Sequence, residues 1–349
     1  MTGNSWAEVI TALIRRTDLS VEQSRWAMNE ILVGAATPAQ IAGFSVALRA
    51  KGESISEVDG LVSAMYDHAV PCQVPGRVLD VVGTGGDRSF SVNISTMAAL
   101  VAAGAGATVV KHGNRSASSQ AGTADVLEQL GVPLDLPPTL VPEVAARAGI
   151  TFCFAPAFHP ALRHAAVPRR ELGVGTTFNI LGPLANPARP QAQLIGCADR
   201  SVAPVMAGVF AHRGQDAWVV CGDDGLDELT TTTTSTVWAV SDGVVSQHSV
   251  DPQEFGITLT TAEQLRGGDA AHNADVVRRL LAGERGPVRD AVVLNAGAAL
   301  AVYEHNEGVI EEQLRAGIAK AETALDEGGA VAVLERWIAA AQAVGTSQT

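Results

Sequence analysis

The sequence predicts an α/β protein with a small all-helical N-terminal domain, residues 1–70, and a larger domain, residues 77–349, around a mainly parallel sheet. Three observations favour this class. Helix start signals recur before residue 70, short β-branched runs alternate with helical segments after residue 77, and hydrophobic residues make up 47% of the 349-residue chain. Helices from about 165–190 are expected to contribute to the smaller domain.

The first 70 positions carry three helix start signals. Segments 20–23 and 54–57 fit the reciprocal capping box, in which a serine and a glutamine or glutamate satisfy each other's backbone N–H groups. Segment 37–40 places Pro38 at the first position of a helix, where its missing N–H costs nothing. Each signal precedes a segment with helical apolar spacing, so the region is predicted to be helical throughout.

After a linker at 71–76, strand-like runs alternate with helical segments, which predicts a mainly parallel sheet. Residues 236–250, with the turn 241–243, look instead like an antiparallel hairpin, and helical signals return from 273 to the end. The predicted parallel strands are 77–82, 108–111, 150–154, 193–197 and 217–221.

Charge and composition exclude several classes of protein. With 24 Lys plus Arg against 37 Asp plus Glu, the net charge is −13, and this disfavours a nucleic-acid partner. The longest apolar stretch, 98–110, is too short and too broken by glycine to span a bilayer, so no membrane association is expected. The 4 cysteines lie far apart, which indicates neither a zinc site nor a disulfide framework and suits a cytoplasmic protein.

The first strand ends in the glycine-rich segment 83–87. Glycines after a strand let the backbone approach a ligand closely and direct its N–H groups at an anion. The spacing fits neither the dinucleotide fingerprint nor the P-loop, so a phosphate cradle and a tight turn without a ligand are both open from this segment alone.

Three further polar segments are expected at the same edge of the sheet. Residues 91–96 precede the apolar helical run 97–106 and offer hydroxyl and amide groups at a helix start. Residues 111–119 are expected to form a loop in which Lys111 and Arg115 cluster. Residues 221–229 are acidic, which suits either a solvated turn or a hard cation such as Mg²⁺. Loops at the carboxyl ends of parallel strands converge, so together these predict a Mg²⁺–diphosphate site.

In order and approximate spacing, these motifs resemble the anthranilate phosphoribosyltransferase family over nearly the whole chain. The resemblance rests on segments 83–87, 93–96, 111–115, 169–173, 178–184 and 227–229. It implies a nucleoside phosphorylase/phosphoribosyltransferase-like fold. It also implies transfer of phosphoribose from 5-phosphoribosyl 1-diphosphate to the amine of anthranilate in tryptophan biosynthesis, with Mg²⁺ as cofactor and a homodimer as the assembly.

The resemblance also implies the residues of each subsite. Magnesium falls to Ser95, Asp227 and Glu228, and anthranilate to Gly83, Asn114 and Arg169, with His112 lining its entry. No residue is assigned as catalytic, because a single histidine in a polar loop is more often a hydrogen-bonding group than a proton acceptor. The residues implied for the sugar diphosphate are Gly83, Gly86, Asp87, Ser91, Asn93, Ile94, Ser95, Thr96, Lys111, His112, Gly113, Asn114, Arg115, Ser116, Ala117, Ser118, Ser119 and Thr123.

Two positions depart from the family's pattern. Ser91 stands where the family often has threonine, which keeps the hydroxyl, and Gly175 stands where many members have arginine. Two other functions stay open: a pyrimidine-nucleoside phosphorylase, and a catalytically silent homologue that acts as a binding module. Segment 111–115 and the acidic pair at 227–228 argue against both.

Overall fold

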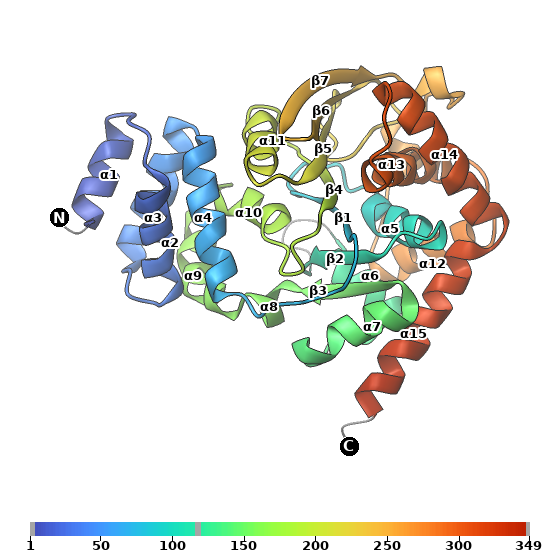
Figure 1. Ribbon diagram of the computed structural model, residues 1–349, viewed down its shortest axis with the longest axis horizontal. Coiled ribbons are helices and arrows are strands. Elements are labelled where there is room, and N and C mark those ends of the chain that lie inside the picture. Colours follow the sequence, from blue (N-terminus) through green and yellow to red (C-terminus); the bar gives the residue numbers. More distant parts are fainter. Residues whose placement is uncertain (1–3, 116–119, 347–349) are drawn as a thin grey trace.

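Four helices form the N-terminal end of the molecule, at the left of Figure 1. The computed structural model describes residues 4–115 and 120–346. Ser20 and Ser54 each form the predicted capping box, and Thr37 forms a third one with Gln40. The helical interpretation of this region is therefore confirmed, and the helices are α1 (Trp6–Ile14), α2 (Val21–Leu32), α3 (Pro38–Lys51) and α4 (Ile55–His68).

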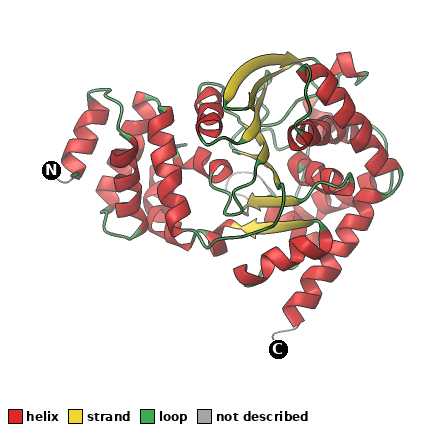
Figure 2. Ribbon diagram, in the orientation of Figure 1, coloured by secondary structure: helices red, strands yellow, loops and turns green. Residues whose placement is uncertain are grey.

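A seven-stranded sheet runs through the rest of the molecule (Figure 2), in the order β3-β2-β1-β4-β5-β6-β7. The first five strands along the chain pair in parallel, and β6 and β7 form the predicted antiparallel hairpin. The mainly parallel sheet is thus confirmed. Its strands are β1 (Leu79–Gly83), β2 (Val109–Gly113), β3 (Ile150–Phe154), β4 (Ala192–Gly196), β5 (Asp216–Gly222), β6 (Ser235–Ser241) and β7 (Val244–Val250).

Three predicted boundaries were wrong by a few residues. The strand predicted from 77 begins at Leu79, because the carbonyl of Arg77 and the N–H of Val78 pair with the side chains of Tyr303 and Gln191 and not with a neighbouring strand. Strand β2 continues beyond the predicted end at 111 to Gly113, so 112 and 113 also lie in the sheet and not in a loop. Helix α5 begins at Ile94 and not at 97, so residues 94–96 form its first turn.

Helices cover both faces of the sheet, and alternate strand residues face each side. Leu194 and Val220 belong to the core under α5 and α13, whereas Ile195 and Val219 belong to the core shared with α1–α4 and α11. In Figure 1, α5 and α13 lie to the right of the sheet, and α1–α4 and α11 lie to its left. The remaining helices are α5 (Ile94–Gly104), α6 (Thr123–Leu130), α7 (Val141–Ala148), α8 (Ala155–Phe158), α9 (Arg163–Leu172), α10 (Phe178–Leu184), α11 (Ala203–His212), α12 (Ala270–Leu281), α13 (Pro287–Glu304), α14 (Ile310–Asp326) and α15 (Gly329–Thr346), with short 3₁₀ turns η1 (Pro138–Leu140), η2 (Pro160–Leu162), η3 (Pro252–Phe255) and η4 (Ala262–Leu265).

Helices α9 and α10 come from the middle of the chain yet pack on the N-terminal helices. Helix α9 contacts α2 and α3, and α10 contacts both α4 and strand β2. The buried side chains of α10 join the same hydrophobic cluster as those of α1–α4. The N-terminal helices are thus joined to the sheet through α10 and α11.

Within the described residues, no helix is long and apolar enough to cross a membrane. All four cysteines, Cys72, Cys153, Cys197 and Cys221, are buried free thiols.

Candidate active site

The carboxyl ends of β1, β2, β4 and β5 lie at one edge of the sheet, as parallel pairing requires. The segments that follow these strands contact one another there. The N–H of Thr84 donates to the carbonyl of Gly196 at 2.9 Å, and the N–H of Gly85 donates to Oδ2 of Asp227 at 2.7 Å. The glycine-rich segment after β1 and the acidic segment after β5 therefore form one site.

Three carboxylates from these two segments meet at the edge of the sheet. Each of Asp87, Asp227 and Glu228 offers an oxygen that lies within 4.8 Å of the other two. Asp227 and Glu228 were predicted as metal ligands, whereas Asp87 was predicted only to contact the sugar diphosphate. We call these three residues the carboxylate trio. Asp87 belongs to it because the turn at positive-φ Gly85 and Gly86 carries the chain back toward β5.

Burial and mutual repulsion oppose ionisation of Asp227 and Glu228. Burial first, and the neighbouring Asp87 second, raise the pKa of Asp227 to about 7. Burial, with Asp227 and Asp87 beside it, raises the pKa of Glu228 well above its ordinary value. Oδ2 of Asp87 and Oε2 of Glu228 are buried without a hydrogen-bond partner in the described structure. The three carboxylates offer the oxygen ligands that suit a hard divalent cation.

Two glycines make room for the acidic segment. A Cβ atom on Gly196 would lie 1.4 Å from the carbonyl oxygen of Asp227, and one on Gly83 would lie 2.2 Å from Oδ2 of Asp227. Neither contact is possible for a real side chain. The bare ends of β1 and β4 therefore allow Asp227 to lie directly on the sheet edge, which is a reason for glycine at Gly83 independent of any ligand.

The first turn of α5 lies beside the trio. The backbone N–H of Ser95 favours the ionised form of Glu228. Asn93 stands at the N-cap but makes no capping hydrogen bond; its side chain instead donates to the carbonyl of Ala121 at 3.3 Å and accepts from Asn273 at 2.8 Å. Ile94 is fully buried in the core, so only its backbone can face a ligand.

Lys111 lies beneath the site and not on a surface loop. Its ammonium is buried, donates to the carbonyl of Val81, and lies 3.3 Å from Oγ of Ser95. Burial lowers the pKa of Lys111 to about 8, and the nearby charges of Asp80, Glu228 and Asp227 oppose that fall. A buried cation at this place offsets part of the negative charge of the trio.

The predicted cluster of Lys111 with Arg115 does not form. Arg115 is exposed, and its guanidinium pairs with Asp125 at 3.0 Å and Glu128 at 2.5 Å on α6. Strand β2 carries Lys111 inward, whereas Arg115 lies beyond the strand's end and reaches the acidic face of α6. Of the other residues predicted here, Asn114 is exposed, Thr123 accepts a hydrogen bond from Thr96 at 3.2 Å, and Ser116, Ala117, Ser118 and Ser119 lie outside the described residues.

His112 is a buried, neutral imidazole. Its Nδ1 lies 3.0 Å from the carbonyl oxygen of Gly182, which can only accept, so Nδ1 carries the proton. Burial, together with His159 at a ring distance of 5.2 Å, lowers the pKa of His112 to about 3. Its Nε2 has no partner among the described residues. His112 is thus a fixed hydrogen-bond acceptor that stays uncharged at neutral pH.

Asp80 and Asn186 form a buried polar pair beneath strand β2. The sequence analysis missed this pair. Asp80 accepts hydrogen bonds from the N–H of His112 at 3.2 Å and from Nδ2 of Asn186 at 2.8 Å. Nδ2 of Asn186 also donates to the carbonyl of Val110 at 2.8 Å. The signal in the sequence was an aspartate inside an otherwise apolar strand, because a buried charge requires such partners.

Arg169 lies on α9, apart from the sheet edge. Its guanidinium lies 5.2 Å from the ring of Phe178 on α10, and its pKa is lowered by burial alone. No acidic side chain in the described ranges forms an ion pair with it. Gly175 is exposed, and a Cβ there would meet only Nδ2 of Asn179, at 3.9 Å. The arrangement leaves a half-buried guanidinium free to pair with an anion.

Comparison with known proteins places this geometry in a family. Residues 7–69 match the helical bundle domain, and residues 75–331 the a/b domain, of a glycosyl transferase family. The chain is 68% identical to the anthranilate phosphoribosyltransferase of a Nocardioides species, over 97% of this chain and 99% of that protein. It is 58% identical to that of Thermobifida fusca, over 98% of this chain and 99% of that protein.

Solved structures agree with the sequence comparison. The anthranilate phosphoribosyltransferase of Thermus thermophilus matches with a TM-score of 0.89 and 40% identity, over 96% of this chain and 99% of that chain. The Saccharomyces cerevisiae enzyme, solved in complex with PRPP (5-phosphoribosyl 1-diphosphate) and Mg, matches with a TM-score of 0.87 and 26% identity, over 97% of this chain and 98% of that chain. The chain belongs to the anthranilate phosphoribosyltransferase family.

Proposed function

We propose that this chain transfers the phosphoribosyl group of 5-phospho-α-D-ribose 1-diphosphate to the amine of anthranilate, giving N-(5-phospho-β-D-ribosyl)anthranilate and diphosphate. In tryptophan biosynthesis this is the step that joins the sugar to the aromatic amine. The observation that carries the proposal is the carboxylate trio beside the first turn of α5, in a chain 68% identical to a named transferase.

Magnesium is the cofactor in this proposal, and the residues fit it. Asp227, Glu228 and Asp87 supply oxygen donors, of which two are buried without another partner. The hydroxyl of Ser95 lies next to them, 3.3 Å from Nζ of Lys111. When bound, Mg²⁺ supplies positive charge that stabilises diphosphate as the leaving group. Ser95, Asp227 and Glu228 remain the proposed ligands, and the geometry adds Asp87 to them.

The sugar diphosphate is proposed to occupy the same edge. Gly83 and Gly86 let the backbone approach a ligand there, and the segment from Ser91 to Thr96 brings hydroxyl groups and the start of α5, where the helix dipole favours an anion. Ile94 takes part through its backbone only. From the polar segment at the end of β2, Lys111 contributes from below and Asn114 from an exposed position, while Arg115 has to leave its pairs on α6 to take part.

Anthranilate is proposed to bind between the sheet edge and α9. Arg169 can pair with its carboxylate through two parallel hydrogen bonds, a geometry that lysine cannot reproduce. Helix α10 links this arginine to the rest of the site, since Phe178 packs on Arg169 and Gly182 holds the ring of His112. Asn114 and Gly83 complete the proposed subsite.

The chain's own groups favour departure of the leaving group over activation of the nucleophile. An aromatic amine is a weak nucleophile, and His112, the nearest candidate base, is a poor one because its pKa lies at about 3. Instead, the ammonium of Lys111, the start of α5 and the glycine-rich turn stabilise the negative charge that develops on the diphosphate. The ribosyl carbon gains positive charge at the same time. Catalysis then rests on electrostatic preorganisation and positioning.

The family's relatives favour the transferase over the two other functions left open. A phosphorylase would require nucleoside and phosphate, and a silent binding module would release no diphosphate. Purified protein with anthranilate, PRPP and Mg²⁺ is expected to release diphosphate in step with the fluorescence change of anthranilate. Diphosphate release that does not depend on anthranilate, or none at all, would contradict the proposal.

The magnesium assignment predicts a specific effect of neutralising the trio. Asp227→Asn with Glu228→Gln is expected to lower turnover roughly a hundredfold or more and to raise the Mg²⁺ concentration needed for half-maximal rate, because amides bind a hard cation poorly. In the absence of metal, the double variant should unfold at a temperature no lower than that of the wild type, because the substitutions remove the repulsion between buried carboxylates. Asp242→Asn, on the exposed β6–β7 turn, is the matched control. Unchanged magnesium dependence would remove both residues from the metal site.

The anthranilate assignment predicts a substrate-specific effect at Arg169. Arg169→Ala is expected to raise the KM for anthranilate by about one to two decades, since a charge-assisted hydrogen bond worth about 1.5–3 kcal/mol is lost, and to leave the KM for PRPP near its original value. The KM of Arg169→Lys for anthranilate should lie between those of the wild type and the alanine variant. Exposed Arg170 is the control, and its alanine variant should behave as wild type. A raised KM for PRPP alone would assign Arg169 to the other substrate.

The division of the chain into domains 1–70 and 77–349 is supported by the two matched family segments, 7–69 and 75–331. A homodimer through the helical domain is proposed on its exposed apolar side chains. Ile14 at the end of α1 is 70% exposed and Val46 on α3 is 44% exposed, and these two helices contact each other. Exposed apolar side chains on two adjacent helices are candidates for burial in a twofold contact.

The dimer proposal is checked by sedimentation velocity at micromolar concentration. The wild type is expected to sediment as a dimer, and Ile14→Glu with Val46→Glu to shift it toward monomer, because buried charges oppose association. Val309→Glu, at another exposed apolar side chain that is 58% exposed, should leave the dimer intact. A wild-type protein that is monomeric throughout would overturn the proposal.

A cytoplasmic location completes the proposal. The observation behind it is that all four cysteines are free thiols, a state that the reducing cytoplasm maintains. Fractionation of the source cells should recover the activity in the cytoplasmic fraction, and its recovery from an exported fraction would contradict this location.

A further inference from the structure

A cavity of about 220 Å³ lies between α12 and the start of α13. Both helices stand on the side of the sheet away from α1–α4 (Figure 1). Its walls include four apolar side chains that belong to or border the core: Val92, Val276, Leu280 and Val288. The cavity is smaller than sites for drug-sized ligands, which span roughly 300–1,000 Å³. It suits a small molecule with an apolar body.

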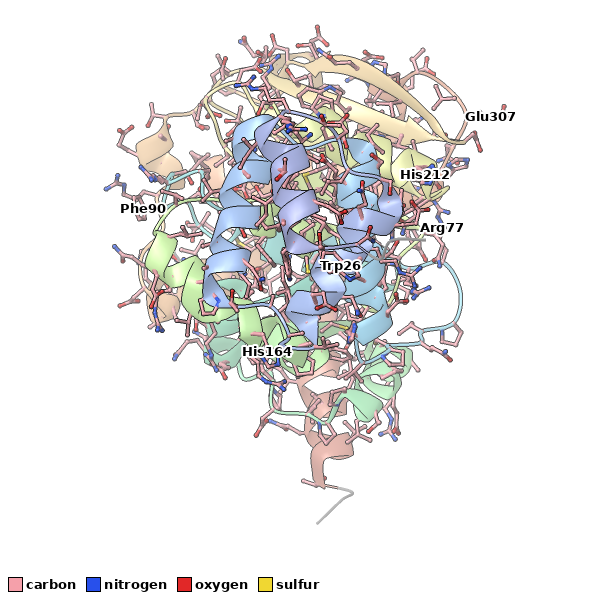
Figure 3. All side chains as sticks on the ribbon, turned by 90° about the vertical axis from the view of Figure 1, so that its left-hand side faces the viewer. Trp26, Arg77, Phe90, His164, His212 and Glu307 are labelled. Atoms are coloured by element: carbon pink, nitrogen blue, oxygen red, sulfur yellow. The ribbon has the colours of Figure 1, made fainter. Side chains whose placement is uncertain are left out.

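The cavity backs onto the segment that follows the glycine-rich turn. Ser91 pairs with Arg266 in a single β-bridge, and the N–H of Val92 donates to the carbonyl of Leu265 at 2.9 Å. Phe90, one residue earlier, has a φ of 54° and is exposed; Figure 3 shows its side chain at the periphery, well away from Trp26 and His164. The carboxylate trio does not line the cavity, so the two sites are distinct.

Four guanidinium groups line the cavity, in a chain whose net charge is −13. They belong to Arg266, Arg279, Arg285 and Arg289, and the only carboxylate in the lining is Glu284, 3.1 Å from Arg279. The other acidic partners, Asp275 for Arg279 and Asp326 for Arg285 and Arg289, are not part of the lining. The cavity surface therefore presents positive charge, although the region as a whole is balanced.

The buried guanidinium of Arg289 favours an anionic ligand in this cavity. Its side chain is only 4% exposed, and while one nitrogen donates to Asp326 at 2.7 Å, Nη1 is buried without a partner in the described structure. A buried donor without an acceptor costs about 1–3 kcal/mol, more for a charged group. Arg289 is one of the residues that line the cavity, and a small shift of its guanidinium would let an oxyanion there accept from Nη1.

The start of α13 adds further donors to the same place. Gly286, at the N-cap with a φ of 128°, provides no side-chain cap, and Pro287 has no N–H to offer. Across the described ranges, the N–H groups of Val288 and Arg289 form no backbone hydrogen bond. The positive end of this 18-residue helix therefore opens toward the cavity, as anion sites commonly require.

We propose that this cavity binds a small organic carboxylate with an apolar body. The carboxylate would accept from Arg289 and the first turn of α13, with Arg266 and Arg285 at the rim, while the apolar body lies against Val276 and Leu280. A bare phosphate would satisfy the donors but leave this apolar wall exposed to water, which disfavours it.

Anomalous diffraction locates the ligand directly. Crystals of the full chain soaked with 4-bromobenzoate are expected to show a bromine peak between α12 and α13, whatever is bound at the reaction site. Crystals soaked with inorganic phosphate should show no density there. Absence of the bromine peak overturns the proposal, and phosphate density in the cavity overturns the assigned ligand class.

Calorimetric titration of 4-bromobenzoate tests the charges in solution. Arg266→Gln with Arg285→Gln, both at exposed positions where folding is not at risk, is expected to weaken one binding step about tenfold, since each removes a charge-assisted interaction. Arg278→Gln is the matched control, because Arg278 lies on α12 beside the cavity but donates to the carbonyl of Gln129 and does not line it. Equal affinity in the wild type and the double variant would overturn the proposal.

Discussion

The close approach of Asp227 to the ends of β1 and β4 is the constraint on which the rest of the site depends. Its carbonyl oxygen lies where a Cβ of residue 196 would stand, and its carboxylate lies where one of residue 83 would stand. With glycine at both places, the acidic segment rests on the sheet edge and Asp227 accepts the N–H of Gly85. Any larger residue would lift the carboxylates away from Asp87 and open the trio.

Bringing three carboxylates together under low exposure requires positive charge nearby, and the fold provides it in stages. Lys111 enters from below on β2, and its own burial is balanced by Asp80 and by two of the trio's three acids, Glu228 and Asp227. Asp80 in turn is held by Asn186 and by the backbone of His112. Polar residues inside the strands thus form a connected layer under the sheet edge, in which no charge is buried alone.

The sequence allowed most of the fold to be predicted, because capping boxes and β-branched runs are local signals. The position of the hairpin and the five parallel strands followed from them, with errors at Arg77 and at the end of β2. Which side chains meet could be predicted less well. The pairing of Arg115 with α6, and the return of Asp87 to the acidic segment, depend on the path of loops in space, which no spacing rule describes. The burial of Lys111, which was predicted where strand β2 gives way to a loop, depends on the neighbouring strands β1 and β3, and no local signal describes them.

Helix α10 explains how two subsites far apart in the sequence can work together. Phe178 at one end packs on the guanidinium of Arg169, and the carbonyl of Gly182 near the other end fixes the ring of His112, which stands on the central sheet. Helix α10 also packs against α4 of the N-terminal bundle. A shift of the bundle relative to the sheet would therefore move Arg169 and His112 through the same short helix. The position of an aromatic acid relative to the diphosphate edge is then set by how α10 sits between the two parts of the chain.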